Sequence, residues 1–265
     1  MLTDAEAVAA IIAEIAAAEI MPRFACLQSH EVREKGPGDL VTVADVAVEH
    51  ALTPRLRDLL PGSLVVGEEA VAAEAAVLDR LEGDDPVWLI DPIDGTFNFA
   101  GGKPVFAVMV ALVRHGETVM GWIYDPVAQA TATAAPGSGA WLQGKRLRVA
   151  AAPAPDANGN RVWRANRRLS RRLAAHPEHQ TTGFDMRCAG HEYLALAGGD
   201  ADVALYNRLH PWDHAAGALI HREAGGFGAL LDGTPYAPRV RGTGLLLAPD
   251  AASWQLLRGL LIASA

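Results

Sequence analysis

The stretch from Val87 to Thr96 constrains the fold more than any other part of the chain. Its first four residues, Val87 to Ile90, are apolar and predict a buried strand. Two carboxylates, Asp91 and Asp94, follow this strand. An ionised carboxylate at the end of a buried strand is costly unless it is paired or binds a metal. The stretch therefore predicts a strand whose end forms part of a polar site.

The chemistry of this strand end suits a divalent metal and a phosphate group. Hard cations such as Mg²⁺ prefer clustered oxygen ligands and often hold a substrate phosphate as well. Gly95 and Thr96 come next, and a Gly-Thr turn that opens a helix offers free backbone N–H groups to phosphate. The alternative is an Asx-turn that only leads into the helix. Gly and Thr at these two positions favour the phosphate site.

Length and composition indicate a globular protein with a sizeable core. The chain has 265 residues, of which 50% are hydrophobic and 20% charged, enough for one large domain or two smaller ones. No apolar run approaches the roughly 18 residues of a membrane span. The acidic, periodic N-terminus predicts no signal peptide. The two cysteines, Cys26 and Cys188, form no disulfide framework, which predicts a reducing, cytoplasmic location.

The net charge of −8 limits the partners that the chain is expected to bind. It argues against general nucleic-acid binding, which normally needs a basic face. It does not argue against a phosphate ester, because a bound metal can invert the local sign of charge. A basic cluster, residues 167–172, is interpreted as a solvated helix face, the alternatives being attraction of an anionic substrate or pairing across a dimer.

The first half predicts two helices packed on a largely antiparallel sheet. Thr3 and Glu6 read as a capping box before apolar residues at helical spacing, and Asp45 opens the second helix. A turn-rich loop is expected over 35–39, and an alanine-rich helix over 71–81. Strands are expected over 40–43, 64–66, 87–90, 104–113, 119–124, 129–135, 139–142 and 146–149.

The stretch 150–160 is rich in Ala, Pro, Asp and Asn, and it is predicted to separate two halves. Residues 1–149 would form an N-terminal α+β half, and residues 150–265 a C-terminal α/β half with the site in the cleft between them. Strands are expected in the second half over 161–166, 201–206 and 243–247, and helices over 168–175, 190–197, 212–224 and 250–262. The predicted fold is an α/β sandwich of alternating helix and sheet layers.

Further carboxylates stand at predicted strand ends and helix starts. They are Glu68 beside Glu69, Asp45 and Asp213. Taken singly, Asp45 and Asp213 also suit helix caps or first-turn positions. Glu68 and Glu69 also suit a solvated loop. No Cys/His or Ser/His pair competes with a metal-based reading, so no covalent nucleophile is expected.

Taken together, these motifs resemble the inositol monophosphatase family of Mg²⁺-dependent phosphatases. Residues 91–96, Asp-Pro-Ile-Asp-Gly-Thr, are similar to its central signature, and residues 212–217 with 223–226 are similar to its second. Gly67-Glu68-Glu69 lies at the right distance upstream. Lys35, residues 39–42 and Asp45 resemble its N-terminal metal loop. The matches follow the family's order, so the resemblance implies its α-β-α-β-α layered sandwich, lithium sensitivity and a homodimer.

The resemblance implies a site for two or three Mg²⁺ ions and a water-based hydrolysis of a small phosphate monoester. The implied ligands are Glu68, Asp91 and the Ile93 carbonyl for the first ion, Asp91, Asp94 and Asp213 for the second, and Asp45 with Glu68 for a weaker third. Gly95 and Thr96 N–H groups would bind the phosphate. Thr96 with Asp45, or Glu68 with Thr96, would orient the attacking water.

The expected substrate pocket is where the chain departs from the family pattern. Its predicted residues are Asp94, Gly95, Thr96, Gly190, His191, Glu192, Tyr206, Arg208 and Asp213. In inositol-specific members a Glu occupies the position of Tyr206 and contacts sugar hydroxyls. The family usually has a run of small residues where this chain has Gly190-His191-Glu192. Both departures argue against strict inositol specificity. Arg208 is either a site for a second anionic group or a solvated rim charge.

Several substrates stay open: inositol 1-phosphate, histidinol phosphate, 3′-phosphoadenosine 5′-phosphate and fructose bisphosphate. A broad or inositol-type phosphatase is preferred. The rival from another class is a non-catalytic protein on the same scaffold that binds RNA or transcription machinery. The intact set of carboxylates and the negative charge argue against that rival.

Overall fold

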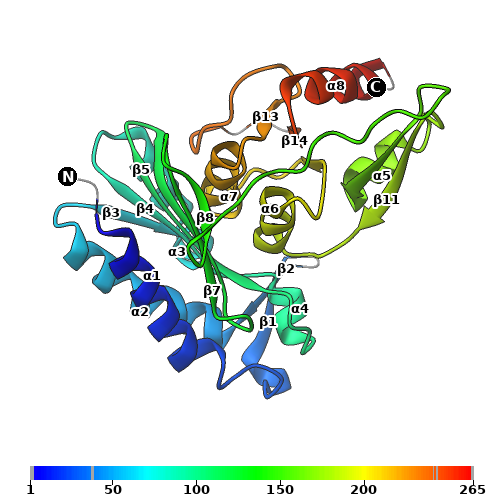
Figure 1. The fold of residues 1–265 in the computed structure, drawn as a ribbon. Coiled ribbons are helices and arrows are strands. Elements are labelled where there is room, and N and C mark those ends of the chain that lie inside the picture. The colour runs from blue at the N-terminus through cyan, green and yellow to red at the C-terminus, as the bar shows by residue number, and fades with distance from the viewer. Residues whose placement is uncertain (1–2, 37–38, 241, 243, 264–265) are drawn as a thin grey trace.

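A seven-stranded sheet organises the N-terminal part of the chain (Figure 1). The computed structural model describes residues 3–36, 39–240, 242 and 244–263. In spatial order the strands are β3 (Leu64–Gly67), β4 (Val87–Asp94), β5 (Ala107–Arg114), β6 (Glu117–Asp125), β7 (Ala130–Ala135), β8 (Gly139–Leu142) and β9 (Lys145–Arg146). β3 and β4 are parallel, and the other neighbours are antiparallel.

Helices cover both faces of this sheet (Figure 1). α1 (Ala5–Ile15) and α2 (Val43–Leu59) pack on one face through a core that includes Ile12, Leu52 and Trp88. α6 (Ala189–Gly198) and α7 (Pro211–Glu223) pack on the other face. Because both faces are covered, the central strands β4 and β5 are apolar at consecutive positions rather than at alternate ones.

A second, smaller β layer lies on the far side of α6 and α7. It contains the antiparallel strands β12 (Ala204–Tyr206), β14 (Leu245–Ala248) and β13 (Phe227–Leu230), and the parallel pair β10 (Arg161–Asn166) and β11 (His179–Phe184). A bridge between Ala165 and Val203 connects the two groups. α5 (Arg167–Leu173) and α8 (Ala251–Ala263) cover its outer face. The predicted α-β-α-β-α sandwich is confirmed.

The local predictions are mostly confirmed, with four corrections. The cap of α1 is Asp4, whose Oδ1 accepts a hydrogen bond from the Glu6 N–H at 2.9 Å, so the Thr3–Glu6 capping box is wrong. The helix expected over 71–81 is broken at Glu74 into α3 (Glu68–Ala73) and the 3₁₀ helix η3 (Ala75–Glu82). β1 (Val32–Gly36), β11 and β13 were not anticipated as strands, because each is short. Strand β9 covers only the start of the expected 146–149 strand.

The remaining short elements all belong to the N-terminal part of the chain. They are the π-helical turn η1 (Ala16–Ile20), the 3₁₀ turn η2 (Ser29–Glu31), the hairpin of β1 (Val32–Gly36) and β2 (Asp39–Thr42), and α4 (Thr96–Ala100). Residues 37 and 38 of the expected loop, and Thr243 of an expected strand, lie outside the described residues.

None of the described helices is both long and apolar enough to cross a membrane. One core cluster joins residues from both sides of position 149, and the division there stays a prediction.

α6 and α7 approach each other closely at Gly217 and Tyr193. Gly217 of α7 lies under the Tyr193 ring, and a Cβ atom there would fall 2.1 Å from a ring carbon. Tyr193 is fully buried and its hydroxyl contacts His214 Nδ1 at 3.0 Å, so the ring cannot move aside easily. The absence of a side chain at residue 217 therefore lets the two helices pack together.

Replacement of Gly217 by Ala is expected to lower the free energy of unfolding by about 1–3 kcal/mol, because the added methyl group overpacks the contact with Tyr193. The matched control is Gly259→Ala in α8, where nothing lies within 4 Å of the added Cβ. That control is expected to raise stability by up to about 1 kcal/mol through helix propensity. Urea unfolding of both variants measures the difference, and equal effects would contradict the packing argument.

Candidate functional site

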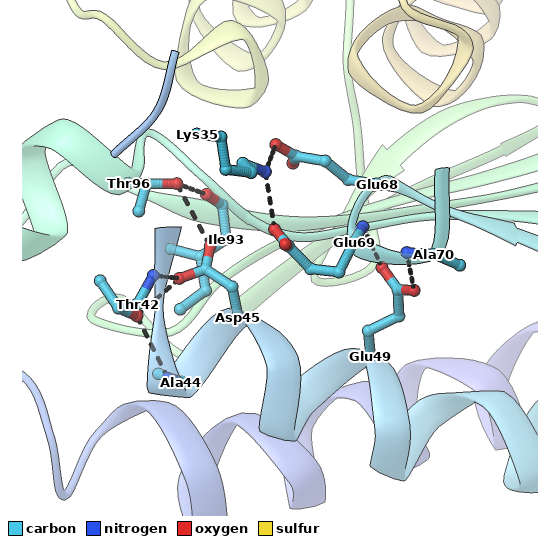
Figure 2. Close-up of polar contacts among 10 residues, drawn as sticks. All are labelled: Lys35, Thr42, Ala44, Asp45, Glu49, Glu68, Glu69, Ala70, Ile93 and Thr96. Atoms are coloured by element: carbon cyan, nitrogen blue, oxygen red, sulfur yellow. Dashed lines mark hydrogen bonds and ion pairs between the residues drawn. The ribbon is translucent and has the colours of Figure 1, made fainter. Parts of the chain in front are cut away.

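The first group of site residues surrounds the start of α2 (Figure 2). Thr42 and Asp45 form a reciprocal capping box, and the Thr42 N–H donates to Asp45 Oδ2 at 2.8 Å. The other carboxylate oxygen, Oδ1, lies 3.2 Å from the Thr96 hydroxyl. Asp45 is 1% exposed, and burial raises its pKa to about 6. The helix cap thus fixes a buried carboxyl against the signature threonine.

The second group lies where β3 ends and α3 begins. Glu49 of α2 caps α3, because its carboxylate accepts hydrogen bonds from the N–H groups of Glu69 and Ala70 at 2.8 and 2.9 Å. Lys35 of β1 reaches across, and Figure 2 shows its ammonium between Glu68 and Glu69 at 2.7 and 2.9 Å. Burial lowers the Lys35 pKa, but the two carboxylates outweigh it and the net shift is upward.

The third group is the end of β4 itself. The ladder between β4 and β5 is irregular between Asp91 and Asp94, and this bulge re-aims the side chains there. Gly95 follows with φ +88°, and an added Cβ would lie 3.0 Å from the Val105 carbonyl oxygen, so the position needs glycine. α4 then begins at Thr96, whose hydroxyl donates to the Ile93 carbonyl at 2.9 Å.

Two groups from the C-terminal half complete the site. The N–H of Gly190 at the start of α6 donates to Asp94 Oδ2 at 2.5 Å, and Cys188 Sγ lies 3.0 Å from the same oxygen. Asp213 stands in the first turn of α7. A cavity of about 370 Å³ is lined by Leu40, Glu68, Asp91, Ile93, Asp94, Gly95, Thr96, Phe97, Arg187 and Asp213. The fold therefore brings the residues of the two signatures and of the Gly67-Glu68-Glu69 motif into one cavity.

The carboxyl groups of this cavity destabilise one another's charged forms. Burial, followed by the charges of Glu68, Asp94, Asp213 and Asp45, raises the pKa of Asp91 well above its ordinary value. Burial also raises the pKa of Asp94, and it raises that of Glu68 to about 7 although Lys35 opposes the shift. Like charges held this close in a buried place favour a cation among them.

The donor set fits a hard divalent cation. Asp91 Oδ1 is buried and has no hydrogen-bond partner in the described part of the protein, and buried acceptors of this kind normally have one. Within the same residues, no group of three or more His, Cys, Asp or Glu side chains is already arranged as a metal-binding cluster. Lys35 contacts Glu68, and Gly190 N–H and Cys188 Sγ both contact one oxygen of Asp94. Oxygen ligands around an orphaned carboxylate are the set that Mg²⁺ prefers.

Of the residues predicted for the substrate pocket, four line this cavity: Asp94, Gly95, Thr96 and Asp213. The other five are not among its lining residues: Gly190, His191, Glu192, Tyr206 and Arg208. Glu192 is 8% exposed, its Oε2 accepts from Asn166 Nδ2 at 3.1 Å, and the Tyr206 hydroxyl lies beside the same carboxyl. His191 Nε2 faces the Phe106 carbonyl at 3.2 Å. Arg208 is exposed and contributes its backbone carbonyl to His214 Nε2 at 2.8 Å.

Sequence reasoning missed Arg187, which lines the cavity and places its guanidinium 4.4 Å from the centre of the Phe97 ring. It also missed the roles of Cys188 and Glu49. Phe97 was a usable signal, because it directly follows the Gly95-Thr96 turn and an aromatic ring can bind a cation. Its partner, however, is far away in the sequence, so only the fold identifies it.

The layered sandwich with an acidic cavity at the end of its central strands belongs to a known class of architecture. An IMPase from Thermotoga maritima superimposes with a TM-score of 0.79 at 23% identity, covering 97% of this chain and 95% of that one. The model of the inositol monophosphatase family matches residues 1–264, and the chain belongs to this family.

Relatives carry two kinds of name. The chain is 32% identical over 212 residues to the Inositol-1-monophosphatase of Bacillus subtilis, covering 77% of each protein. It is 37% identical over 207 residues to Nus factor SuhB of Pseudomonas aeruginosa, covering 74% of this chain and 73% of that one. Membership of the family is therefore secure, and the names do not by themselves select one substrate.

Glu192→Gln is expected to change the pH dependence of stability. Burial raises the Glu192 pKa from 4.5 to about 7. Between these values the folded state binds more protons than the unfolded state, so the free energy of unfolding falls as pH rises. The Gln variant cannot ionise, so it should match the wild type near pH 4.5 and exceed it by up to about 3 kcal/mol above pH 7.

Urea unfolding between pH 4.5 and 8 measures this difference, with the exposed Glu74→Gln as the control. A difference that does not grow with pH would show that Glu192 is not an ionising buried group.

Proposed function

We propose that the protein hydrolyses a small phosphate monoester in a reaction that depends on Mg²⁺. The observation that carries the proposal is the orphaned, buried Asp91 in a cavity lined by three further carboxylates and by the Gly95-Thr96 turn. Carboxylate oxygens suit the metal, and backbone N–H groups at the turn suit the phosphate. Relatives named Inositol-1-monophosphatase support the same reaction.

The proposed ligands are those the sequence suggested. They are Glu68, Asp91 and the Ile93 carbonyl for one ion, Asp91, Asp94 and Asp213 for a second, and Asp45 with Glu68 for a third. When bound, Mg²⁺ would supply Lewis acidity toward the phosphoryl oxygens and lower the pKa of a water molecule. The substrate phosphate would be bound by the Gly95 and Thr96 N–H groups, which are fixed before the substrate arrives.

Thr96 and its neighbours are placed to position the attacking water. The Thr96 hydroxyl lies between Ile93 O at 2.9 Å and Asp45 Oδ1 at 3.2 Å. Since it has one proton to donate, a lone pair stays available to accept from a water in the cavity. The carboxylates of Glu68 and Asp45 would take up the proton that the water releases. No covalent enzyme intermediate is required.

The proposed substrate is an inositol-type or similarly small phosphate ester, and histidinol phosphate or a nucleoside bisphosphate is the alternative. Two residues support a substrate preference that differs from the inositol-specific pattern. Glu192 stands where the pattern has a small residue, and Tyr206 stands where it has a Glu. We further propose lithium inhibition and a homodimer, as the resemblance implies, and a cytoplasmic location, as the lack of a disulfide framework suggests.

A second candidate is a non-catalytic role with RNA or transcription machinery. The relative named Nus factor SuhB favours it. The complete set of carboxylates in the cavity supports the catalytic proposal, since a protein without catalysis has no need to bury like charges together.

A phosphate-release screen tests the proposal directly. Inositol, histidinol, nucleotide and sugar phosphates are incubated with the protein and Mg²⁺, with and without EDTA or Li⁺. Mg²⁺-dependent release from at least one ester that EDTA abolishes is the expected outcome. If no ester releases phosphate at saturating Mg²⁺, the binding role gains support and the hydrolase proposal fails.

Asp91→Asn is expected to lower turnover by at least about 100-fold, since one oxygen ligand and its charge are lost. In EDTA the same variant should be more stable than the wild type by about 1–3 kcal/mol, because an unpaired buried charge is removed. It should also lose the rise in melting temperature that Mg²⁺ gives the wild type.

Thermal unfolding with and without Mg²⁺ provides the second readout, and Asp84→Asn, whose side chain is 95% exposed, is the matched control. Wild-type turnover by Asp91→Asn at saturating Mg²⁺ would refute the assignment of Asp91.

A further inference from the structure

Asp94, one of the proposed metal ligands, is held by the start of α6 through one of its two carboxylate oxygens. The Gly190 N–H donates to Asp94 Oδ2 at 2.5 Å, and Cys188 Sγ lies 3.0 Å from the same oxygen. A carboxylate oxygen has about two lone pairs, so these two donors use the hydrogen-bonding capacity of Oδ2. Oδ1 is therefore the oxygen that Asp94 can offer to a cation.

The Cys188 thiol is the donor in its contact with Asp94. Cys188 is 2% exposed and belongs to an apolar core cluster. A thiol in apolar surroundings beside a carboxylate keeps its proton, because neither neighbour stabilises a thiolate. A carboxylate that binds a metal is ionised and can only accept hydrogen bonds. The S–H group therefore donates to Asp94 Oδ2.

The position of Cys188 is fixed by the turn that follows Asp94. A Cβ atom added at Gly95 would lie 3.1 Å from the Cys188 Cβ, so the cysteine packs directly against this turn. Asn98 of α4 donates through Nδ2 to the Met186 carbonyl at 2.7 Å, which connects the segment before Cys188 to the same turn. The thiol is thus held in place on both sides of its contact with Asp94.

Asp91 differs from Asp94 in how its oxygens are used. Asp91 Oδ1 is buried and has no hydrogen-bond partner in the part of the chain that the structure describes. Both carboxylates line the same cavity. The cavity therefore combines one carboxylate with an oxygen left open to a cation and one carboxylate whose second oxygen is already engaged.

From these contacts we infer that Cys188 is a positioning residue, which confines Asp94 to a one-oxygen contact with the cation and so favours Mg²⁺ over Ca²⁺. The inference rests on the proposed function. Mg²⁺ needs near-ideal octahedral geometry, whereas Ca²⁺ accepts about six to eight oxygens and often takes both oxygens of one carboxylate. A carboxylate with one oxygen engaged by donors meets the first requirement and not the second.

The Mg²⁺ and Ca²⁺ affinities of two Cys188 variants test the inference. Cys188→Ala removes the donor, so Mg²⁺ binding should weaken by about 10-fold, as when other groups that orient a metal ligand are removed. Ca²⁺ binding should stay within about twofold, because Asp94 Oδ2 is then freer to bind it. Cys188→Ser keeps a donor and should stay within about threefold of the wild type for both ions. Thermal unfolding over a range of each ion's concentration measures both affinities without substrate.

Turnover provides a second readout. In Cys188→Ala the Mg²⁺ concentration that gives half the maximal rate should rise by about 10-fold. KM for the ester at saturating Mg²⁺ should stay within about twofold, because no contact with the ester is removed. Cys26→Ala, at the exposed cysteine, is the matched control and should change neither quantity.

Infrared spectra test the hydrogen bond itself in a protein that keeps Cys188. The chain has two cysteines, so the S–H stretching band of Cys26→Ala belongs to Cys188 and that of Cys188→Ser belongs to Cys26. Donation to a carboxylate should place the Cys188 band at lower wavenumber than the Cys26 band. Equal positions of the two bands would overturn the inference even if Cys188→Ala failed to fold.

The outcomes distinguish this inference from the proposed function. If the wild type releases no phosphate from any ester at saturating Mg²⁺, the proposed function fails. If it releases phosphate but Cys188→Ala weakens Mg²⁺ and Ca²⁺ binding equally, or weakens neither, the inference is overturned while the function stands. Equal losses of Mg²⁺ affinity in Cys188→Ala and Cys188→Ser would also overturn it, because the donor would then make no difference.

Discussion

The structure depends on the burial of several carboxyl groups at one end of β4. Asp91 is 2% exposed, and its charge is opposed by burial and by the acids around it. Such a group is tolerated only where a cation or a proton compensates it. Lys35 compensates part of the charge by pairing with Glu68 and Glu69. Asp91 Oδ1 has no partner in the described structure, and it is the acceptor that the proposed metal would use.

The surroundings of these acids are arranged to hold them in place. Thr42 fixes Asp45, Glu49 fixes the start of α3, and the start of α6 fixes Asp94. On α7, buried His214 contacts Tyr193 and the Arg208 carbonyl, and burial lowers its pKa to about 4, so it is neutral and acts as a packing group rather than as a charge. Helix starts recur in this list because their free N–H groups stabilise carboxylates without another acid or base.

The surroundings of the cavity near α6 have fewer acidic groups facing one another. Glu192, Asn166 and Tyr206 form a buried polar group that does not line the cavity, while Arg187 and Phe97 form its rim. The carboxyl of Glu192, with its raised pKa, is neutral over part of the physiological range and adds less negative charge there than an exposed glutamate would. The acidic part of the cavity and its surroundings near α6 thus differ in charge and in the residues that form them.

The sequence by itself determined the local features of this protein. The apolar run before Asp91, the Gly95-Thr96 turn and the periodic helices each depend on neighbouring residues. The existence of α1 and α2, the bounds of α6 and α7 and the start of β4 were therefore predicted, whereas β4 continues past Ile90 to Asp94. Prediction from the sequence failed for β11 and β13, whose short sequences become strands only through pairing with β10 and β14. Tertiary structure alone decided that Lys35 pairs with Glu68, that Cys188 and Gly190 hold Asp94, and that Arg187 stacks on Phe97. These pairs are remote along the chain, and their meeting depends on how the layers pack, which no local pattern encodes.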